Sequence, residues 1–196
     1  MSRGTGLRVI AGSAGGLHLQ APRGGRSRPT TDRVRESLFA ALDQRFGLGD
    51  VAVLDLYAGS GALAIEALSR GAARAVLVDK DVTAVEAIRR NLAATRLRDR
   101  GRVWRSSVAV FLAGPPPPEA PFDLVLLDPP YAATEGEVER ALESLAGAGW
   151  LAPGATVVVE RGTGTPRPAL PGSWDIAWER AYGDTLVIVA VTEPSS

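Results

Sequence analysis

The middle of the chain alternates short apolar runs with segments whose apolar residues recur every three or four positions. Four apolar runs and one shorter run predict buried β-strands, at residues 51–56, 74–78, 122–127, 156–160 and 103–104. Helical spacing predicts helices after the first two strands, and two more at residues 108–112 and 134–145. Strands that alternate with helices favour an α/β fold, in which a parallel sheet carries helices on both faces.

Both ends of the chain carry hairpin patterns. Residues 174–180 and 185–192 flank a turn signal at Tyr182-Gly183-Asp184 and predict an antiparallel hairpin, in which Trp174 and Trp178 are expected on one face. Residues 7–11 and 17–20 flank a glycine-rich turn and predict a second, smaller hairpin.

A segment rich in Gly, Arg and Pro separates the first hairpin from the rest of the chain. It leads into a helix that begins at Thr30 or Thr31, with Val34, Leu38 and Leu42 among its inward positions. We therefore expect a basic N-terminal extension over residues 1–30 and a main domain over residues 31–196.

The formal net charge of zero hides a strong gradient along the chain. Residues 1–35 and residues 89–105 each hold seven Arg and one acid, whereas residues 119–196 hold twelve acids and four Arg. Of the 22 cations 21 are Arg, whose planar guanidinium suits phosphate and base contacts. This asymmetry favours an anionic partner on one side of the molecule.

Composition excludes several classes of protein. The absence of cysteine excludes disulfide scaffolds, thiolate metal sites and cysteine nucleophiles, and no His, Asp and Glu cluster has metal-ligand spacing. The longest apolar run has six residues, at 186–191, and the N-terminus lacks the apolar core of a signal peptide. We expect a soluble cytoplasmic protein that binds no metal and no membrane, as a monomer.

A glycine-rich loop follows the first predicted strand, and it runs Asp55-Leu56-Tyr57-Ala58-Gly59-Ser60-Gly61. Glycines at the end of such a strand let a ligand approach the backbone and the N-terminus of the next helix. Asp79 ends the second strand, where a carboxylate can accept hydrogen bonds from both ribose hydroxyls. The loop predicts a nucleoside cofactor but also fits the dinucleotide pattern, so the cofactor stays open; a bare turn, with Asp79 as a helix cap, is the alternative.

A second motif, Asp128-Pro129-Pro130-Tyr131, directly follows the fourth strand. Ligands of parallel sheets bind outside the carboxyl ends of the strands, so this motif and the glycine loop should share one crevice. Asp128 and the Pro129 carbonyl can accept both hydrogens of an exocyclic amino group, and Tyr131 can stack on the base. A rigid turn without a ligand is the alternative.

These motifs resemble those of class I S-adenosylmethionine-dependent methyltransferases that act on an amino nitrogen. Two N-terminal stretches, residues 8–12 and residues 28–39, narrow the resemblance to the RsmD family, the bacterial small-subunit ribosomal RNA guanine-N2 methyltransferases. The resemblance spans about residues 8–191. It implies a Rossmann-like, mostly parallel seven-stranded sheet with a C-terminal antiparallel hairpin and a small N-terminal hairpin-plus-helix extension.

The resemblance also implies the reaction, which is methyl transfer from S-adenosylmethionine to the exocyclic N2 of a specific guanine in 16S ribosomal RNA, free or in the small ribosomal subunit. It assigns Asp128, Pro129, Pro130 and Tyr131 to catalysis, and it assigns cofactor binding to Asp55, Tyr57, Gly59, Ser60, Gly61, Asp79 and Ser107. The family usually has an acid after the third strand to bind the adenine ring, where this chain has Ser106 and Ser107.

The clustered N-terminal arginines are expected to bind RNA phosphates, and they are Arg23, Arg26, Arg28, Arg33 and Arg35. Three other functions remain open. An adenine-N6 methyltransferase acting on DNA or RNA would use the same Asp-Pro-Pro-Tyr motif. A nicotinamide-dependent oxidoreductase would use the same glycine loop, and a non-enzymatic RNA-binding module would need only the arginines.

Overall fold

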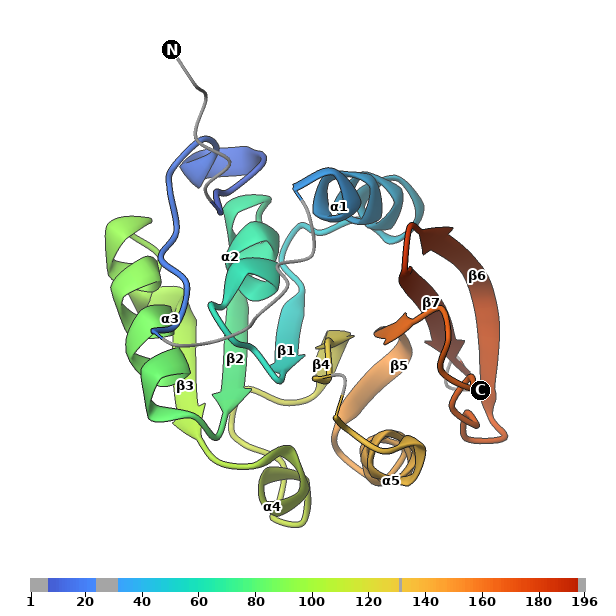
Figure 1. The fold of residues 1–196 in the computed structure, drawn as a ribbon. Helices are drawn as coiled ribbons and strands as arrows, with labels where there is room; N and C mark the ends of the chain where they lie inside the picture. Colours follow the sequence, from blue (N-terminus) through green and yellow to red (C-terminus); the bar gives the residue numbers. More distant parts are fainter. Residues whose placement is uncertain (1–6, 24–31, 131, 194–196) are drawn as a thin grey trace.

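The computed structural model describes residues 7–23, 32–130 and 132–193. The described residues form one seven-stranded sheet in the order β3-β2-β1-β4-β5-β7-β6 (Figure 1). The strands are β1 (Ala52–Leu56), β2 (Arg74–Asp79), β3 (Gly101–Arg105), β4 (Phe122–Leu127), β5 (Leu151–Gly162), β6 (Trp174–Tyr182) and β7 (Thr185–Thr192). β1 to β5 are parallel to one another, while β7 pairs antiparallel with both β5 and β6. The predicted fold class is confirmed.

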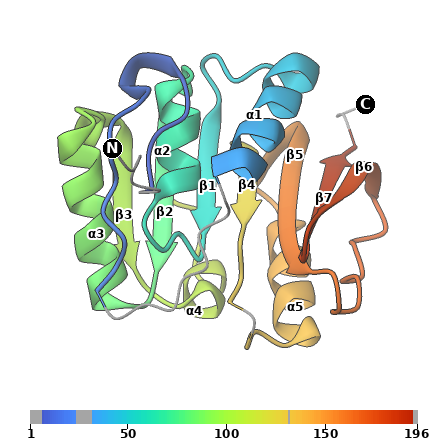
Figure 2. The ribbon, with the colours of Figure 1, turned by 45° about the horizontal axis from the view of Figure 1, so that its top comes forward.

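Helices cover both faces of the sheet, as Figure 2 shows. They are α1 (Asp32–Phe46), α2 (Ala62–Ser69), α3 (Val82–Ala94), α4 (Val108–Leu112) and α5 (Glu135–Leu145), with short 3₁₀ turns at η1 (Gly12–Ala14) and η2 (Arg98–Arg100). One apolar cluster joins α1, α2 and α3 to the sheet, and a second joins α4 and α5 to its other face. Every residue of β1 is buried, as expected for a central strand of a parallel sheet.

The starts of two helices follow directly from the sequence. The Asp81 carboxylate caps α3 by accepting hydrogen bonds from the backbone N–H groups of Thr83 and Ala84. Thr134 and Glu137 form a capping box at the start of α5, in which each side chain accepts from the other residue's backbone. These caps fix where α3 and α5 begin, at the edge of the sheet where the candidate site lies.

The N-terminal segment forms less of a hairpin than its pattern predicts. Its described part has an antiparallel bridge between Arg8 and the exposed His18, and the N–H groups of Val9 and Leu19 donate across it to the carbonyls of Leu17 and Leu7 at 2.9 and 2.8 Å. Beyond this short pairing, the backbone N–H groups of Ile10 and Ala11 donate to the buried Glu66 carboxylate on α2, at 2.7 and 3.1 Å. Residues 7–23 thus pack on the main core, and the division of the chain at residue 30 stays a prediction.

A bulge in β6 changes the expected positions of two tryptophans. The pairing of β6 with β7 shifts between Ile176 and Trp178, so one extra residue enters the strand. Trp174 packs in the cluster beneath α4 and α5, whereas Trp178 packs against the cluster on the opposite face. The prediction that both lie on one face is therefore wrong, because the bulge breaks the period of two.

Candidate functional site

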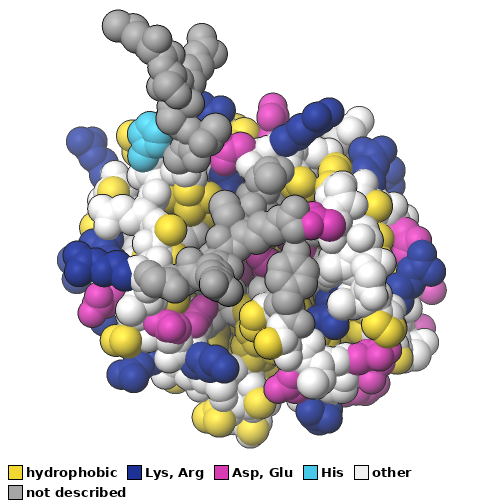
Figure 3. Space-filling view, viewed as in Figure 1, with side chains coloured by type: hydrophobic (Ala, Val, Ile, Leu, Met, Phe, Trp, Pro, Cys, Tyr) yellow, Lys and Arg dark blue, Asp and Glu magenta, His cyan; other side chains and the backbone are white. Residues whose placement is uncertain are grey.

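A cleft of about 1260 Å³ opens at the carboxyl ends of the parallel strands. Its lining comes from the segments that follow β1, β2, β3, β4 and β5, together with parts of α1 and of the β6–β7 hairpin. On the corresponding face of the molecule, Lys and Arg side chains lie mostly toward the edge (Figure 3). The glycine loop and the Asp128-Pro129-Pro130 segment both line this cleft, so the prediction that they share one crevice is confirmed.

The glycine loop turns sharply between β1 and α2. Tyr57, Gly59 and Gly61 have φ values of 64°, 56° and 77°, in the left-handed region. A Cβ at Gly61 would lie 3.1 Å from Leu77 Cδ2 and 3.3 Å from Ile88 Cγ1, so no larger residue fits there without movement of the core. The loop is also held from behind, because the Ala58 N–H donates to the Val78 carbonyl at 3.0 Å.

Asp79 lies at the end of β2 and accepts two backbone hydrogen bonds. Its Oδ2 accepts from the N–H of Gly59 at 2.8 Å, and its Oδ1 accepts from the N–H of Asp81 at 2.9 Å. The helix cap of α3 is Asp81 rather than Asp79. Each carboxylate oxygen of Asp79 retains a second lone pair that can accept from a ligand hydroxyl. The hydrogen bond from Gly59 to Oδ2 holds the glycine loop in place.

Asp55 lies within β1 and is 1% exposed. Its Oδ2 accepts a hydrogen bond from the Ala64 N–H at 3.1 Å, and its buried Oδ1 has no partner among the described residues. Burial and the charges of Asp128 and Asp79 together raise the pKa of Asp55 to about 8, while the Ala64 hydrogen bond opposes them. Asp55 therefore lines the cleft as a buried carboxyl group whose protonated form is favoured.

Tyr57 of the glycine loop and Ser107, after β3, both line the cleft. Burial raises the pKa of the Tyr57 hydroxyl, the Glu137 charge adds to this effect, and the Arg161 charge opposes it. Ser107 caps α4, since its hydroxyl accepts from the Val110 N–H at 3.3 Å. The hydroxyl hydrogen of Ser107 thus stays available to a ligand at the end of β3.

Asp128 and Pro129 leave the sheet directly after β4, and both line the cleft. Burial raises the pKa of the Asp128 carboxyl to about 6. Pro129 is buried and has no N–H, so its backbone offers only a carbonyl acceptor. The carbonyl of Pro130 accepts from the Ala133 N–H at 2.8 Å and closes the turn. Tyr131, the predicted stacking residue, lies outside the described residues.

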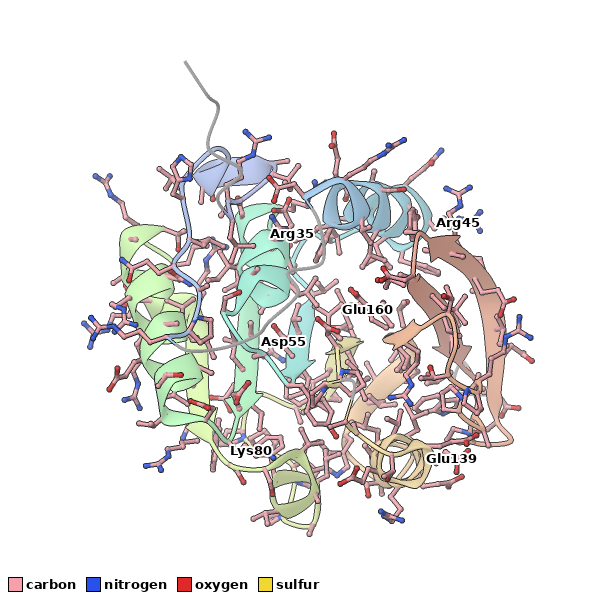
Figure 4. The ribbon with its side chains drawn as sticks, viewed as in Figure 1. Arg35, Arg45, Asp55, Lys80, Glu139 and Glu160 are labelled. Carbon is pink, nitrogen blue, oxygen red and sulfur yellow. The ribbon has the colours of Figure 1, made fainter. Side chains whose placement is uncertain are left out.

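Two charged residues at the end of β5 also line the cleft, and the sequence analysis missed them. Glu160 is 3% exposed and Arg161 is 8% exposed. Figure 4 shows Glu160 and Asp55 on the two sides of β4. Their signal in the sequence is a Glu-Arg pair directly after the apolar run of a strand, where parallel sheets place ligand contacts.

The predicted RNA-binding arginines differ in their surroundings. Arg33 is exposed on α1 and lines the cleft, and Arg23 is exposed beside the start of α3, where its carbonyl accepts from Thr83 Oγ1 at 3.3 Å. Arg26 and Arg28 lie outside the described residues.

Arg35 corrects one of these expectations. It is 1% exposed, and its guanidinium donates to the Arg8 carbonyl and to Asp32 Oδ1. A side chain that is buried and engaged in this way holds α1 to the N-terminal segment, so it is not positioned to contact a phosphate.

Two further predictions concern metal ions and membranes. In residues 7–23, 32–130 and 132–193, no group of three or more His, Cys, Asp or Glu side chains is arranged to hold a metal ion. The helices in the described ranges are all too short or too polar to span a membrane.

Comparisons with known proteins show the family to which the chain belongs. The family described as Conserved hypothetical protein 95 matches residues 7–191. The chain is 38% identical to Ribosomal RNA small subunit methyltransferase D of Escherichia coli (strain K12), over 90% of this chain and 85% of that one. It is 34% identical to the protein of the same name from Haemophilus influenzae, over 90% and 89% of the two chains.

Solved structures show the same architecture. The structure of yhhF from Escherichia coli superposes with a TM-score of 0.84 at 34% identity, covering 96% of this chain and 99% of that one. An RNA methyltransferase from Salinibacter ruber in complex with S-adenosyl-L-homocysteine shares the fold, with a TM-score of 0.58 at 18% identity over 86% and 95% of the two chains. The chain therefore belongs to the Conserved hypothetical protein 95 family, the RsmD family of ribosomal RNA small subunit methyltransferases.

Proposed function

We propose that this protein transfers a methyl group from S-adenosylmethionine to the exocyclic N2 of a guanine in 16S ribosomal RNA. One observation carries the proposal: Asp128 and Pro129, which can accept the hydrogens of an amine, line the same cleft as the glycine loop and Asp79, which suit a nucleoside. The chain's similarity to ribosomal RNA small subunit methyltransferase D supports the choice of RNA.

The residues present fit the cofactor. Gly59 and Gly61 have positive φ values, which give the loop its sharp turn, the N–H of Gly59 donates to Asp79, and Asp55 keeps an unpartnered buried oxygen beneath the loop. In the proposed complex, Asp79 holds the ribose hydroxyls and Ser107 contacts the adenine ring. When bound, S-adenosylmethionine supplies a methyl group on a sulfonium, which is a strong electrophile.

The chain's own residues then prepare the nucleophile. The lone pair of an exocyclic amine is delocalised into the ring, so the amine is a poor nucleophile. When the ionised Asp128 carboxylate and the Pro129 carbonyl each accept one amine hydrogen, the lone pair is localised and directed away from them. In the direct displacement the N–CH3 bond forms as the bond from the methyl carbon to sulfur breaks, which leaves S-adenosylhomocysteine, and the Asp128 carboxylate is proposed to take the proton that the amine loses. Positioning is the main catalytic contribution in such a displacement, and Tyr131 is proposed to keep the base in plane by stacking.

RNA binding requires contacts outside the crevice. The target base must leave its stack to reach Asp128, which costs a few kcal/mol and is easier in a loop than in a duplex. Arg33 at the cleft, with Arg23, Arg26 and Arg28, is proposed to bind the flanking phosphates.

Labelled-methyl transfer tests this proposal. The protein is incubated with S-adenosylmethionine labelled in the methyl group and with isolated 16S RNA, assembled small subunits or large-subunit RNA, with Asp128→Ala as the blank. We expect the labelled methyl group to enter isolated 16S RNA or assembled small subunits, and not large-subunit RNA. No incorporation, or equal incorporation into large-subunit RNA, would contradict it. Stabilisation of the protein by NAD rather than by S-adenosylhomocysteine would favour the oxidoreductase.

A further inference from the structure

Arg161 is a buried arginine whose charge is not matched inside the protein. It is the penultimate residue of β5 and is 8% exposed, and its Nε is buried without a hydrogen bond. In the part of the chain that the structure describes, no hydrogen bond or ion pair engages its guanidinium. Arg35, which is also buried, differs because it binds Asp32 and the Arg8 carbonyl. Because Arg161 lines the cleft and its buried Nε has no acceptor, a ligand that enters the cleft can supply one.

Glu137 is an acidic residue that shares the surroundings of Tyr57 with Arg161. The charges of both residues act on the ionisation of Tyr57. The Oε2 atom of Glu137 accepts from the Thr134 N–H at 2.7 Å and from Thr134 Oγ1 at 3.0 Å in the capping box of α5. Among the described residues no hydrogen bond or ion pair joins Glu137 to Arg161, so the Arg161 guanidinium can donate to a ligand.

The position of Arg161 separates it from the cofactor residues. Leu127 on β4 pairs with Val159 on the parallel strand β5. Asp128 follows Leu127 directly, and Arg161 comes two residues after Val159, so the two residues leave neighbouring strands at the same edge of the sheet. Asp79 and the glycine loop follow β2 and β1, on the other side of β4. Asp128 thus lies between the cofactor side of the cleft and Arg161, and both Asp128 and Arg161 line the cleft.

We propose that Arg161 is the residue that selects guanine, by donating hydrogen bonds to O6 of the target base. This inference rests on the proposed function, because it assumes that the N2 amine is held at Asp128 and Pro129. From N2, the guanine ring continues through N1 to the acceptor O6, and N7 lies beyond it. Arginine matches the O6 and N7 acceptors with its two parallel N–H donors, which is the commonest specific contact to guanine.

Adenine cannot make this contact in the same pose. With its N6 amine in the place of guanine N2, adenine presents C2–H at the position of O6. The Arg161 guanidinium would then stay buried without an acceptor, which disfavours the complex. The same residue thus accounts for preference of guanine over adenine, although Asp128-Pro129-Pro130 could accept either amine.

Atom replacement in the RNA tests the role of Arg161. Once the modified nucleotide is mapped, it is replaced by 2-aminopurine, which keeps the exocyclic amine and lacks O6. Single-turnover methyl transfer is compared for the parent protein, Arg161→Met, Arg161→Lys and the control Arg167→Met. Arg167 is exposed, pairs with Glu179 and does not line the cleft.

We expect the parent and Arg167→Met to react about 10- to 150-fold more slowly with 2-aminopurine than with guanine. Arg161→Met should lose a similar factor on guanine and show little further loss on 2-aminopurine, and Arg161→Lys should keep only part of the preference. S-adenosylhomocysteine affinity should be the same in all four proteins, since Gly59 and Asp79 are unchanged.

Three results would overturn the inference. If Arg161→Met keeps the parent's preference for guanine over 2-aminopurine, Arg161 does not read O6, while transfer to guanine by the parent would leave the proposed function intact. If Arg161→Met and Arg161→Lys lose S-adenosylhomocysteine binding, the guanidinium belongs to the cofactor side. If the parent methylates adenine instead of guanine, the proposed function fails and the role of Arg161 fails with it.

Discussion

Replacement of Asp79 by alanine removes a carboxylate with two tasks. In the free protein it accepts from the N–H groups of Gly59 and Asp81, at 2.8 and 2.9 Å. In the proposed complex the same oxygens also accept from the ribose hydroxyls of S-adenosylmethionine. We therefore expect Asp79→Ala to weaken cofactor binding through lost ribose contacts and through a looser glycine loop.

The magnitude follows from the number and kind of hydrogen bonds. A hydrogen bond to a charged group contributes about 1.5–3 kcal/mol. The Asp79 carboxylate, which accepts from both ribose hydroxyls, should contribute a total in this range to the free energy of cofactor binding. The dissociation constant of S-adenosylmethionine should therefore rise by about 10- to 150-fold. Because Asp81, and not Asp79, caps α3, the loss should not come from unravelling of that helix.

Calorimetry with two ligands separates the two tasks of Asp79. S-adenosylhomocysteine and its 2′-deoxy analogue are titrated into the parent and into Asp79→Ala. If Asp79 binds the ribose, the parent should discriminate between the ligands and the variant should discriminate much less. Asp81→Ala is the control, since it removes a neighbouring carboxylate that caps α3. Unchanged affinity of Asp79→Ala for S-adenosylhomocysteine would refute a role of Asp79 in cofactor binding. If both proteins discriminate equally between the two ligands, Asp79 stabilises the glycine loop and does not bind the ribose.

Four further outcomes are expected. Asp128→Ala should abolish transfer and leave S-adenosylhomocysteine affinity largely intact; turnover within about threefold of the parent would contradict the role of Asp128. Because burial raises the pKa of Asp128 to about 6 and the ionised form accepts the amine hydrogens, the rate of transfer should rise with pH through about 6; a flat single-turnover profile from pH 5 to 7.5 would refute this. Replacing Arg26, Arg28 and Arg33 with alanine should weaken RNA binding and reduce its log–log salt slope by about two to three, with cofactor affinity unchanged; an unchanged slope would assign the segment to packing. Asn91→Leu should lower the free energy of unfolding by about 2–4 kcal/mol in urea titrations, because Gln20 and Ser60 lose their hydrogen bonds to the buried amide, whereas the exposed Arg89→Ala should change it by less than about 0.5 kcal/mol.

The sequence predicted most of the sheet because its central strands carry local signals. Phe122–Leu127 is the fourth strand in both the prediction and the structure, and the cap of α3 at Asp81 needed only its own residues. The glycine loop, Asp79 and Asp128 lie at the same edge of the sheet because the strands before them are parallel. These features depend on residues that are close together in the chain, so they can be predicted from a single sequence.

The remaining features depend on contacts between distant residues. Glu66 is the one charged residue in α2 and is fully buried; besides its ion pair with Arg70 at 2.7 Å, it accepts from the N–H groups of Ile10 and Ala11, which are more than fifty positions away. Arg35 belongs to an arginine-rich segment by sequence, yet its contact with the Arg8 carbonyl makes it part of the core. No local pattern reports such pairings, and the bulge in β6 is likewise set by its pairing with β7.

The identity of the methylated nucleoside distinguishes guanine methylation from adenine methylation. Small ribosomal subunits or 16S RNA lacking the modification are incubated with the protein and S-adenosylmethionine carrying a deuterated methyl group, then digested to nucleosides and analysed by mass spectrometry. We expect the label in N2-methylguanosine with the parent protein, and no label with Asp128→Ala. Label in N6-methyladenosine, or no labelled nucleoside with the parent protein, would contradict the proposed function.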